Sequence, residues 1–250
     1  MTLTQTQIDF FHEQGYLVLG PLLKQEEIET LRSEYDGEFR KAVEAGGARN
    51  LAVEKADDKQ DKKKDAPAQM LQIMQMCERN LQFRKLIYDT RILDAIQDLI
   101  GPNIMLFHDQ ALFKPARHGG PVNWHQDNAY WKCSPAMLLS CWMTLDDVDV
   151  HNGAMQVIPG SHLRPVWHEE TNTPALIETK GFDKSKAVVV DLPAGGAMLH
   201  HCQTLHYTAP NTTDRQRRAF AIHFMPPGTR GRDGKTLQVG YARPMLRMSM

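Results

Sequence analysis

The sequence predicts an α+β protein in which helices precede a β core that is either closed or built from two sheets. Apolar residues recur at helical spacing through most of the first 100 positions. After Gly101 the pattern changes to short apolar runs interrupted by Gly and Pro, which is typical of strands and turns. Every histidine except His12 lies in this second part, so the imidazoles concentrate in the β core.

We expect one domain over residues 1–250, because a chain of this length with 42% hydrophobic residues can bury a large core. Within it we predict a mainly helical part over 1–100, the β core over 101–228 and a tail over 229–250. No internal repeat divides the chain further.

The composition excludes several classes of protein. A formal net charge of -1, without a run of arginines interleaved with aromatics, argues against a nucleic-acid partner. No apolar run approaches the roughly 20 residues of a membrane span, and the N-terminus has no signal-peptide core. Four scattered cysteines without a CxxC pair argue against disulfides or a thiolate zinc site. We therefore expect a cytoplasmic protein with a small-molecule partner and no membrane partner; the composition does not specify the oligomeric state.

The N-terminal elements carry clear boundary signals. Thr4 and Gln7 form a capping-box pattern ahead of a short helix, and Gly15 is a natural helix end. A strand is expected next, over residues 16–19. From Lys24 to Ala45 apolar residues follow helical spacing, which predicts a long amphipathic helix.

Residues 46–69 break this pattern, since their centre is a mixed-charge run with almost no apolar residues. Such a segment cannot bury a core, so we predict a flexible loop there, with a role as an active-site lid as a further hypothesis. Two more helices are predicted over 70–76 and 81–100, the second ending at Gly101.

Eight strands are predicted after Gly101, each a short apolar run between turn residues. They span residues 104–114, 121–125, 137–145, 153–158, 187–192, 197–200, 205–208 and 217–225. We assign no element to the tail from Thr229.

His125 and Asp127 are two residues apart at the end of a predicted strand, where both side chains point to the same side. His206 lies in another strand-like run and is the best candidate for a third metal ligand. Two imidazoles and one carboxylate on one face form the facial triad of non-haem Fe(II) oxygenases. Arg217 offers a fixed, bidentate charge for the distal carboxylate of a dicarboxylic acid. By spacing alone, an iron triad, a zinc hydrolase and purely structural histidines all remain open.

The other histidines are weaker candidates. His201 is interpreted as a pocket residue rather than a ligand, and His223, although it shares the strand face of Arg217, as a core residue. Arg218 should point away from Arg217, which favours a surface role. Loop or solvated positions are predicted for His108, His118, His151 and His168.

Several short motifs follow one another along the chain. They are Phe113-Lys114-Pro115, Trp124-His125-Gln126-Asp127, Leu145-Asp146-Asp147, Asn152-Gly153-Ala154-Met155, Ile158-Pro159-Gly160-Ser161-His162, and His206-Tyr207-Thr208-Ala209-Pro210-Asn211 with Arg217-Arg218. In this order the set resembles the phytanoyl-CoA dioxygenase (PhyH) family of Fe(II)/2-oxoglutarate-dependent oxygenases. The likeness runs from about residue 7 to 226.

This resemblance implies a double-stranded β-helix (jelly-roll) core with N-terminal helices packed on it. It also implies Fe(II) as the metal, with 2-oxoglutarate and O2 as co-substrates that yield succinate, CO2 and an oxidised substrate. By matching positions, His125, Asp127 and His206 would hold the iron. The 2-oxoglutarate contacts would come from five residues: Arg217, Thr208, Trp142, Gln110 and Gln72.

The substrate is not specified by the resemblance, because the family acts on very different small molecules. Asn128, Tyr130 and Trp131 directly follow the two central ligand candidates, and with His201 they are our predicted substrate-pocket residues. Core packing is the alternative role for the aromatic pair. A metal-dependent hydrolase or isomerase on the same fold, and a catalytically silent binding module, are the alternative functions.

Overall fold

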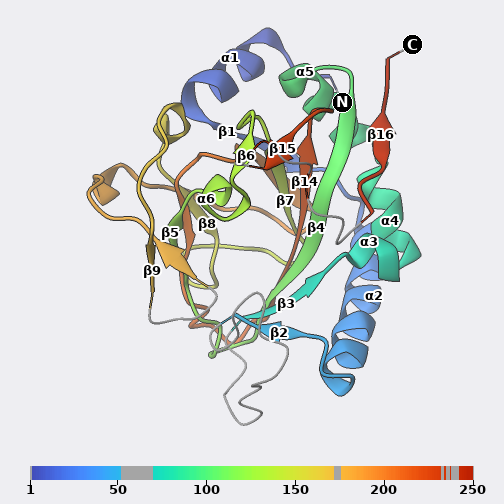
Figure 1. The fold of residues 1–250 in the computed structure, drawn as a ribbon. Helices are drawn as coiled ribbons and strands as arrows, with labels where there is room; N and C mark the ends of the chain where they lie inside the picture. The colour runs from blue at the N-terminus through green and yellow to red at the C-terminus, as the bar shows by residue number, and fades with distance from the viewer. Residues whose placement is uncertain are drawn as a thin grey trace.

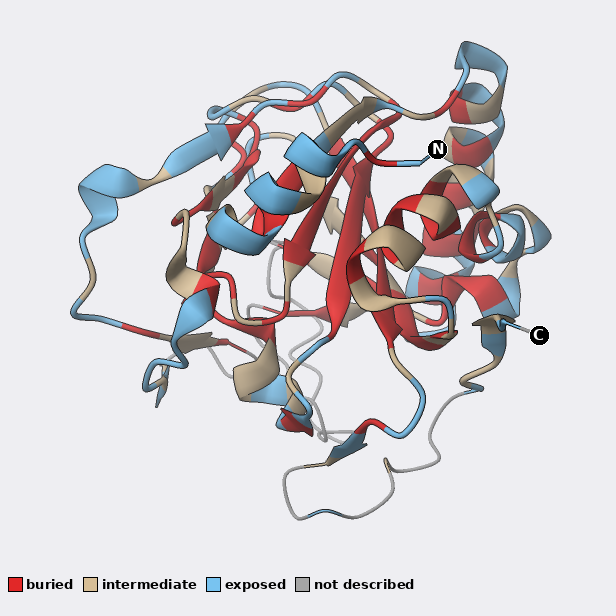
Figure 2. Cartoon of the chain, turned by 90° about the horizontal axis from the view of Figure 1, so that it is seen from above, coloured by how far each residue is buried: buried red, intermediate tan, exposed pale blue. Residues whose placement is uncertain are grey.

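The computed structural model describes residues 2–51, 70–171, 176–231, 234, 237 and 242–249. Two antiparallel sheets face each other, and helices cover the outer face of the larger one (Figure 1). This arrangement confirms the predicted α+β class and the jelly-roll core. Buried positions are concentrated in the central strands and on the helix faces turned toward them (Figure 2).

The first helices begin and end where the sequence predicts. Helix α1 spans Gln5–Gln14, with the Thr4–Gln7 capping box formed and Gly15 in the left-handed conformation at its C-terminus. Strand β1 (Tyr16–Pro21) leads into α2 (Gln25–Glu44), whose apolar stripe packs into the main core.

The predicted helix over 70–76 is wrong, because Leu71–Met74 form strand β3 instead. This strand pairs with the long strand β4 (Ile104–Lys114), so Ile73 enters the core while Gln72 and Met74 face the other side. A four-residue apolar run does not distinguish a strand from a helical turn, and the free edge of β4 decides the outcome.

The predicted helix over 81–100 is divided in two. A short helix α3 (Met76–Arg79) precedes α4 (Leu81–Ile87), and α5 (Thr90–Ile100) follows. The break occurs at Asp89, whose carboxylate accepts a hydrogen bond from the Arg91 backbone N–H at 2.8 Å and so caps α5. The sequence contained this signal, an Asp before an apolar helical run.

The larger sheet has the strand order β1–β12–β7–β14–β4–β3–β2, with β16 also paired to β4. The smaller sheet has the order β11–β8–β13–β5. The strands not yet bounded are β2 (Arg49–Asn50), β5 (Val122–His125), β7 (Leu139–Thr144), β8 (Met155–Val157), β11 (Val188–Val190), β12 (Gly196–His201), β13 (His206–Thr208), β14 (Arg217–Met225) and β16 (Met245–Arg247). Each of the eight predicted strands is present.

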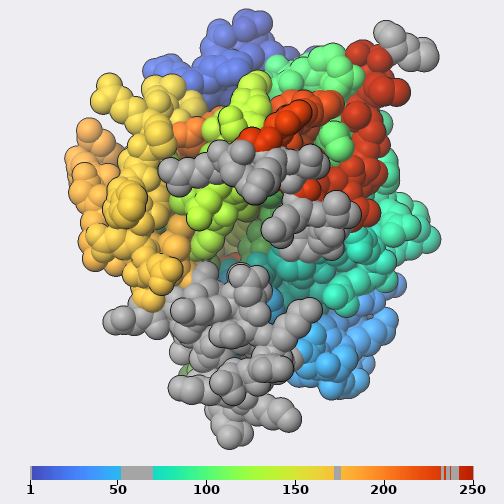
Figure 3. Space-filling view, in the orientation of Figure 1, coloured from blue at the N-terminus to red at the C-terminus, as the bar shows by residue number. Residues whose placement is uncertain are grey.

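Short elements fill the connections between these strands. Helix α6 (Asp127–Trp131) follows β5, and β6 (Cys133–Ser134) pairs with β15 (Arg230–Gly231). A hairpin of β9 (Glu169–Glu170) and β10 (Ile177–Glu178) lies between β8 and β11, and the chain between β8 and β11 forms one side of the molecule (Figure 3). Strands β15 and β16 correct the expectation that the tail has no regular element.

The predicted loop over 46–69 is described only at its start, where Arg49 and Asn50 form β2. Its remainder, residues 52–69, lies outside the described residues, and so does the lid hypothesis. Within the described ranges, no helix is long and apolar enough to cross a bilayer.

Strand β14 lies at the centre of the larger sheet, and its two faces differ. Phe220, Ile222 and Phe224 belong to the main core with the helices, whereas Ala221 and His223 line a cavity between the two sheets. A strand buried on both faces is characteristic of a sheet covered on both sides.

Arg218, which we predicted to have a surface role, faces the helices and is buried. It forms ion pairs with Asp36 of α2 at 2.8 Å and with Asp146 at 2.7 Å. These two carboxylates compensate its charge and attach α2 to the sheet.

Candidate active site

The two sheets place three predicted ligands together. His125 ends β5 and lies directly opposite His206 on β13, with 4.2 Å between their ring centroids. Asp127 begins α6, two residues further on. One ligand atom from each of the three side chains lies within 4.8 Å of the others. Asp127 Oδ1 is 3.5 Å from His125 Nε2 and 3.6 Å from His206 Nε2.

Backbone carbonyls fix the orientation of both imidazoles. Nδ1 of His125 donates a hydrogen bond to the Asn123 carbonyl at 2.7 Å, and Nδ1 of His206 donates to the Thr204 carbonyl at 2.9 Å. Because a carbonyl can only accept, Nδ1 carries the proton, and Nε2 keeps a lone pair directed at the site. Burial holds the pKa of His206 well below its ordinary value, which keeps its ring neutral.

The second oxygen of Asp127 is held by the larger sheet. Oδ2 accepts hydrogen bonds from Ser140 Oγ at 3.1 Å and from His200 Nε2 at 3.2 Å. Burial opposes ionisation of Asp127, but the neighbouring His206, His125 and His200 keep the pKa of its carboxyl well below the usual range. Oδ1 is therefore the oxygen available to a metal ion, and Oδ2 is committed to protein donors.

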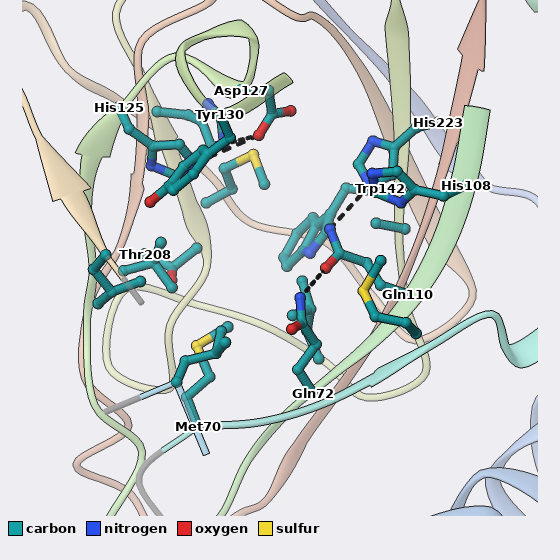
Figure 4. A pocket seen from close by; sticks show the side chains of 18 of the residues that line it. Met70, Gln72, His108, Gln110, His125, Asp127, Tyr130, Trp142, Thr208 and His223 are labelled. Atoms are coloured by element: carbon teal, nitrogen blue, oxygen red, sulfur yellow. Dashed lines mark hydrogen bonds and ion pairs between the residues drawn. The ribbon is translucent and has the colours of Figure 1, made fainter. Parts of the chain in front are cut away.

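A chain of hydrogen bonds continues from Ser140 across the larger sheet, and its part from His223 through Gln110 to Gln72 is visible in Figure 4. Ser140 Oγ is 2.7 Å from His223 Nδ1, and His223 Nε2 is 3.0 Å from the amide nitrogen of Gln110. The carbonyl oxygen of Gln110 accepts from the Gln72 amide, and the carbonyl oxygen of Gln72 accepts from Arg49 at 2.8 Å.

All hydrogen bonds of this network are donated in the same direction, from Arg49 toward Asp127. Because the Gln110 amide nitrogen donates to Nε2 of His223, that ring must carry its proton on Nδ1 and donate to Ser140. Ser140 is then left to donate to Asp127. Burial lowers the pKa of His223 to about 4, which keeps the ring neutral in this role. Hydrogen bonds thus connect Arg49 at one edge of the sheet to Asp127 in the metal cluster.

The cavity extends from this metal cluster between the sheets and has a volume of about 240 Å³. Arg217 lies at its far end, fully buried. One of its nitrogens, NH1, donates to the Leu112 carbonyl at 2.9 Å, whereas Nε and NH2 have no partner among the residues that the structure describes. The hydroxyl of Thr208 is likewise buried without a partner among the described residues. The ring centroid of Trp142 lies 5.9 Å from Cζ of the Arg217 guanidinium.

The far end also carries an excess of positive charge. Lys114, opposite Arg217 in the β4–β14 pair, is fully buried and donates to the Thr208 and Ala209 carbonyls at 3.2 and 2.5 Å. Burial, together with the charge of Arg217, holds the pKa of Lys114 well below its ordinary value, and burial lowers that of Arg217 to about 10. Within the described ranges no carboxylate forms an ion pair with either residue.

Two of the four predicted substrate-pocket residues line the cavity, and two do not. Tyr130 lies edge-on to the His125 ring, and Trp131 packs against His223. Asn128 instead uses its amide on the backbone of Cys133, at 2.9 and 3.2 Å, so it stabilises the turn after α6. His201 also lies outside the cavity lining.

The position of His201 follows from strand alternation. On β12 it is His200 that faces the metal cluster, so its neighbour His201 points to the opposite side, with its ring 5.4 Å from that of His162. We therefore omit His201 and Asn128 from the proposed pocket.

Sequence reasoning missed four site residues: Ser140, His200, His223 and His108. They form one row across β12, β7, β14 and β4, since His200 is opposite Ser140, Ser140 opposite His223, and His223 opposite His108. His108 is buried in the cavity wall, which corrects its predicted loop or solvated position. Strand alternation identified the inward side of His223, but only the register reveals the row.

The residues present fit the metal and co-substrate that the sequence suggests. Two imidazole nitrogens and one carboxylate oxygen are the donor set of the Fe(II) facial triad. The unpaired donors of Arg217 and Thr208 fit a carboxylate group brought by a ligand, because buried donors without partners are otherwise costly. A dicarboxylic acid that spans the cavity from metal to Arg217 would satisfy both ends.

Comparisons with known proteins agree with this arrangement. Over 237 residues the chain is 26% identical to the human protein "Phytanoyl-CoA dioxygenase, peroxisomal", covering 89% of this chain and 68% of that one. Over 147 residues it is 31% identical to the Stutzerimonas stutzeri protein "Probable alpha-ketoglutarate-dependent hypophosphite dioxygenase", covering 56% of this chain and 51% of that one. The chain spans only about half the length of the first curated relatives it matches.

Solved structures share the fold. The non-heme monooxygenase ThoJ in its apo form superposes with a TM-score of 0.77 at 24% identity, covering 98% of this chain and 84% of that one. The structure of EvdO2 from Micromonospora carbonacea var. aurantiaca complexed with 2-oxoglutarate has a TM-score of 0.69 at 28% identity, covering 90% of this chain and 92% of that one.

The family model described as "Phytanoyl-CoA dioxygenase (PhyH)" matches residues 11–219. This stretch runs from α1 into β14 and contains each of the three clustered ligands together with Arg217. The chain therefore belongs to the phytanoyl-CoA dioxygenase family.

Proposed function

We propose that this protein is an Fe(II)/2-oxoglutarate-dependent dioxygenase that hydroxylates an unactivated C–H bond of a small molecule. The observation that supports this most is the pairing of two features in one cavity. A cluster of His125, Asp127 and His206 lies at one end, and the unpaired donors of Arg217 and Thr208 lie at the other. Family membership supports the same reaction class.

In this proposal Fe(II), bound with 2-oxoglutarate, supplies the O2 chemistry that couples decarboxylation of the co-substrate to succinate and CO2 with oxidation of the substrate. His125, Asp127 and His206 would hold the metal through one atom each. Arg217 and Thr208 bind the distal carboxylate of 2-oxoglutarate and so set its orientation. The protein thus contributes positioning and charge.

The rest of the cavity excludes water and holds the substrate. Trp142 and Met155 form apolar walls beside Arg217, so that charge is compensated by the co-substrate rather than by solvent. Tyr130 and Trp131 lie on the metal side, where they are suited to contact a substrate. A metal-dependent hydrolase with the same ligands would leave the unpaired donors of Arg217 without a purpose.

The test is production of succinate from 2-oxoglutarate by the purified protein, with Fe(II) and O2 each supplied or omitted. We expect succinate only when both are present, and loss of at least roughly 100-fold in the Asp127→Ala variant, because loss of a ligand removes the metal. A matched control is His118→Ala, which removes an exposed imidazole outside the cavity. Ordinary 2-oxoglutarate turnover by the Asp127→Ala protein would contradict the ligand assignment.

A further inference from the structure

Arg49 is a second arginine of the cavity wall, distant in sequence from the family motifs. It lies on β2, the edge strand of the larger sheet, directly opposite Gln72 of β3. Its NH1 donates to the Gln72 side-chain carbonyl at 2.8 Å. The side chain is therefore anchored through one nitrogen, and the hydrogen-bond chain that reaches the metal cluster begins at this residue.

The opposite edge of the same guanidinium is unused. Among the described residues, neither Nε of Arg49, which is buried, nor NH2 has a hydrogen-bond partner. Nε and NH2 together form the edge that binds a carboxylate or phosphate through two parallel hydrogen bonds. A buried donor without a partner is unfavourable, and a ligand that accepts hydrogen bonds at this edge would remove that cost.

Among the described residues, no carboxylate forms an ion pair with Arg49 either. In the described part of the cavity wall the single carboxylate is Asp127, whose oxygens belong to the metal cluster. Arg49 is separated from Arg217 by the intervening strands β3 and β4. The two arginines thus define two different anion positions, and one 2-oxoglutarate carboxylate at Arg217 does not use the second.

Apolar side chains lie next to Arg49. Leu51 follows it by two residues and forms a backbone hydrogen bond of 2.9 Å with Met70, and both residues line the cavity, as does Met74 of β3. A ligand that satisfies both features has an oxyanion at one end and a short apolar body.

We propose that Arg49 binds the oxyanion group of the substrate, which is a small, partly apolar acid with a carboxylate or a phosphorus oxyanion. This inference rests on the proposed oxygenase function and adds the chemical class of its substrate. Arg49 pairs with Gln72, Gln72 with Leu112, and Leu112 with Ala219, so these residues form one row across the sheet. On β14, Ala219 is four residues from His223, a separation of about 13 Å along the strand. The acid group would therefore be held away from the metal, with the apolar part directed toward it.

The test compares acids with uncharged analogues of the same size. Protein loaded with Ni(II) and 2-oxoglutarate, which does not turn over, is heated with hexanoate, pentylphosphonate or hexanamide, and the midpoint of unfolding is recorded. We expect one or both acids to raise the midpoint by several degrees more than hexanamide, because a ligand bound only to the native state stabilises it. Comparison of the two acids identifies the preferred oxyanion.

Two variants assign this preference to Arg49. Arg49→Met should lose the difference between acid and amide, whereas Arg40→Met, which removes an exposed arginine of α2, should retain it. Equal stabilisation by acid and amide in the unaltered protein, absence of stabilisation by either acid, or an acid preference that persists in Arg49→Met would each overturn the proposal.

Calorimetry of 2-oxoglutarate binding separates this role from that of Arg217. The Kd for 2-oxoglutarate should change less than about twofold in Arg49→Met, and a tenfold weaker Kd would reassign Arg49 to the co-substrate. The succinate assay distinguishes the two proposals. Without Fe(II)-dependent succinate formation, the oxygenase proposal fails even if Arg49 binds acids; with succinate formation but no acid preference, only the role of Arg49 fails.

Discussion

The two ends of the cavity differ in how far their polar atoms are satisfied by the protein itself. At the metal end, Asp127 Oδ2 has two protein donors, and both ligand imidazoles donate to backbone carbonyls. At the far end, Arg217 and Thr208 keep buried donors without partners. The first end is organised before any ligand arrives, whereas the second is organised around a group that the ligand must bring.

This difference predicts opposite consequences for substitutions at the two ends. Where the protein completes its own hydrogen bonds, removal of a partner should reduce stability and ligand affinity together. Where it leaves donors unpaired, removal should reduce ligand affinity without a cost in stability. Such a division between stability and function is expected where a site holds an uncompensated charge.

The largest effect is expected for Arg217→Met. Loss of the charge paired with the distal carboxylate should weaken 2-oxoglutarate binding by about 2–5 kcal/mol, at least roughly 30-fold in Kd measured by calorimetry. In the ligand-free protein the same change removes a buried, uncompensated charge, so the free energy of unfolding should rise. A fall in stability together with affinity would show that the far end is also organised by the protein.

Arg218→Met is the matched control, since the neighbouring arginine faces the helices and is paired with two carboxylates. Its loss should lower the free energy of unfolding by about 1–2 kcal/mol and leave the Kd for 2-oxoglutarate unchanged, because the pairs are partly exposed and lie outside the cavity. Urea denaturation of both variants measures the contrast directly.

Ser140→Ala tests the metal end. The change removes one of the two donors to Asp127 Oδ2 and leaves the His223 Nδ1–H without its acceptor. We expect metal affinity, measured with Ni(II) by calorimetry, to fall about 10–100-fold, with a loss of about 1–3 kcal/mol in stability. Ser140→Thr, which keeps the hydroxyl, should recover part of both, and unchanged Ni(II) affinity in Ser140→Ala would contradict the positioning role.

The smallest effect is expected for Thr208→Val. Valine keeps the shape of the side chain and removes only the hydroxyl, whose oxygen has no protein partner. The KM for 2-oxoglutarate should rise about tenfold, because the variant loses one hydrogen bond to the charged carboxylate, worth about 1.5 kcal/mol. Thermal stability of the ligand-free protein should stay the same, and a lower unfolding midpoint would indicate an unrecognised structural role.

The sequence was informative where a side chain acts through its own local motif. The His125–Asp127 spacing, His206 and the offset of Arg217 were each readable, as were the Thr4 cap and the strands of the β core. What could not be read was the register between strands far apart in the chain. Ser140, His200 and His223 are unremarkable in sequence, and only pairing of β12, β7 and β14 brings them to Asp127.

The same limit explains the errors. The sequence predicts a helix where β3 forms because its partner β4 begins some 30 positions later. It favours His201 over His200 because one position decides which side of a strand a residue faces. Arg49 gives no signal in the sequence, since it lies at the start of a segment whose composition predicts a loop. In each case tertiary pairing outweighed local pattern.

Strand β14 also sets the size of the space in which chemistry can occur. Its cavity side carries Ala219 and Ala221, and its helix side carries the larger Phe220, Ile222 and Phe224. A slip of one residue would exchange the two sets, because neighbouring residues of a strand face opposite sides. Aromatic rings would then fill the cavity and alanines would leave holes under the helices. The volume of the pocket and the packing of the core therefore both depend on the register of this nine-residue strand, so a change in register alters both.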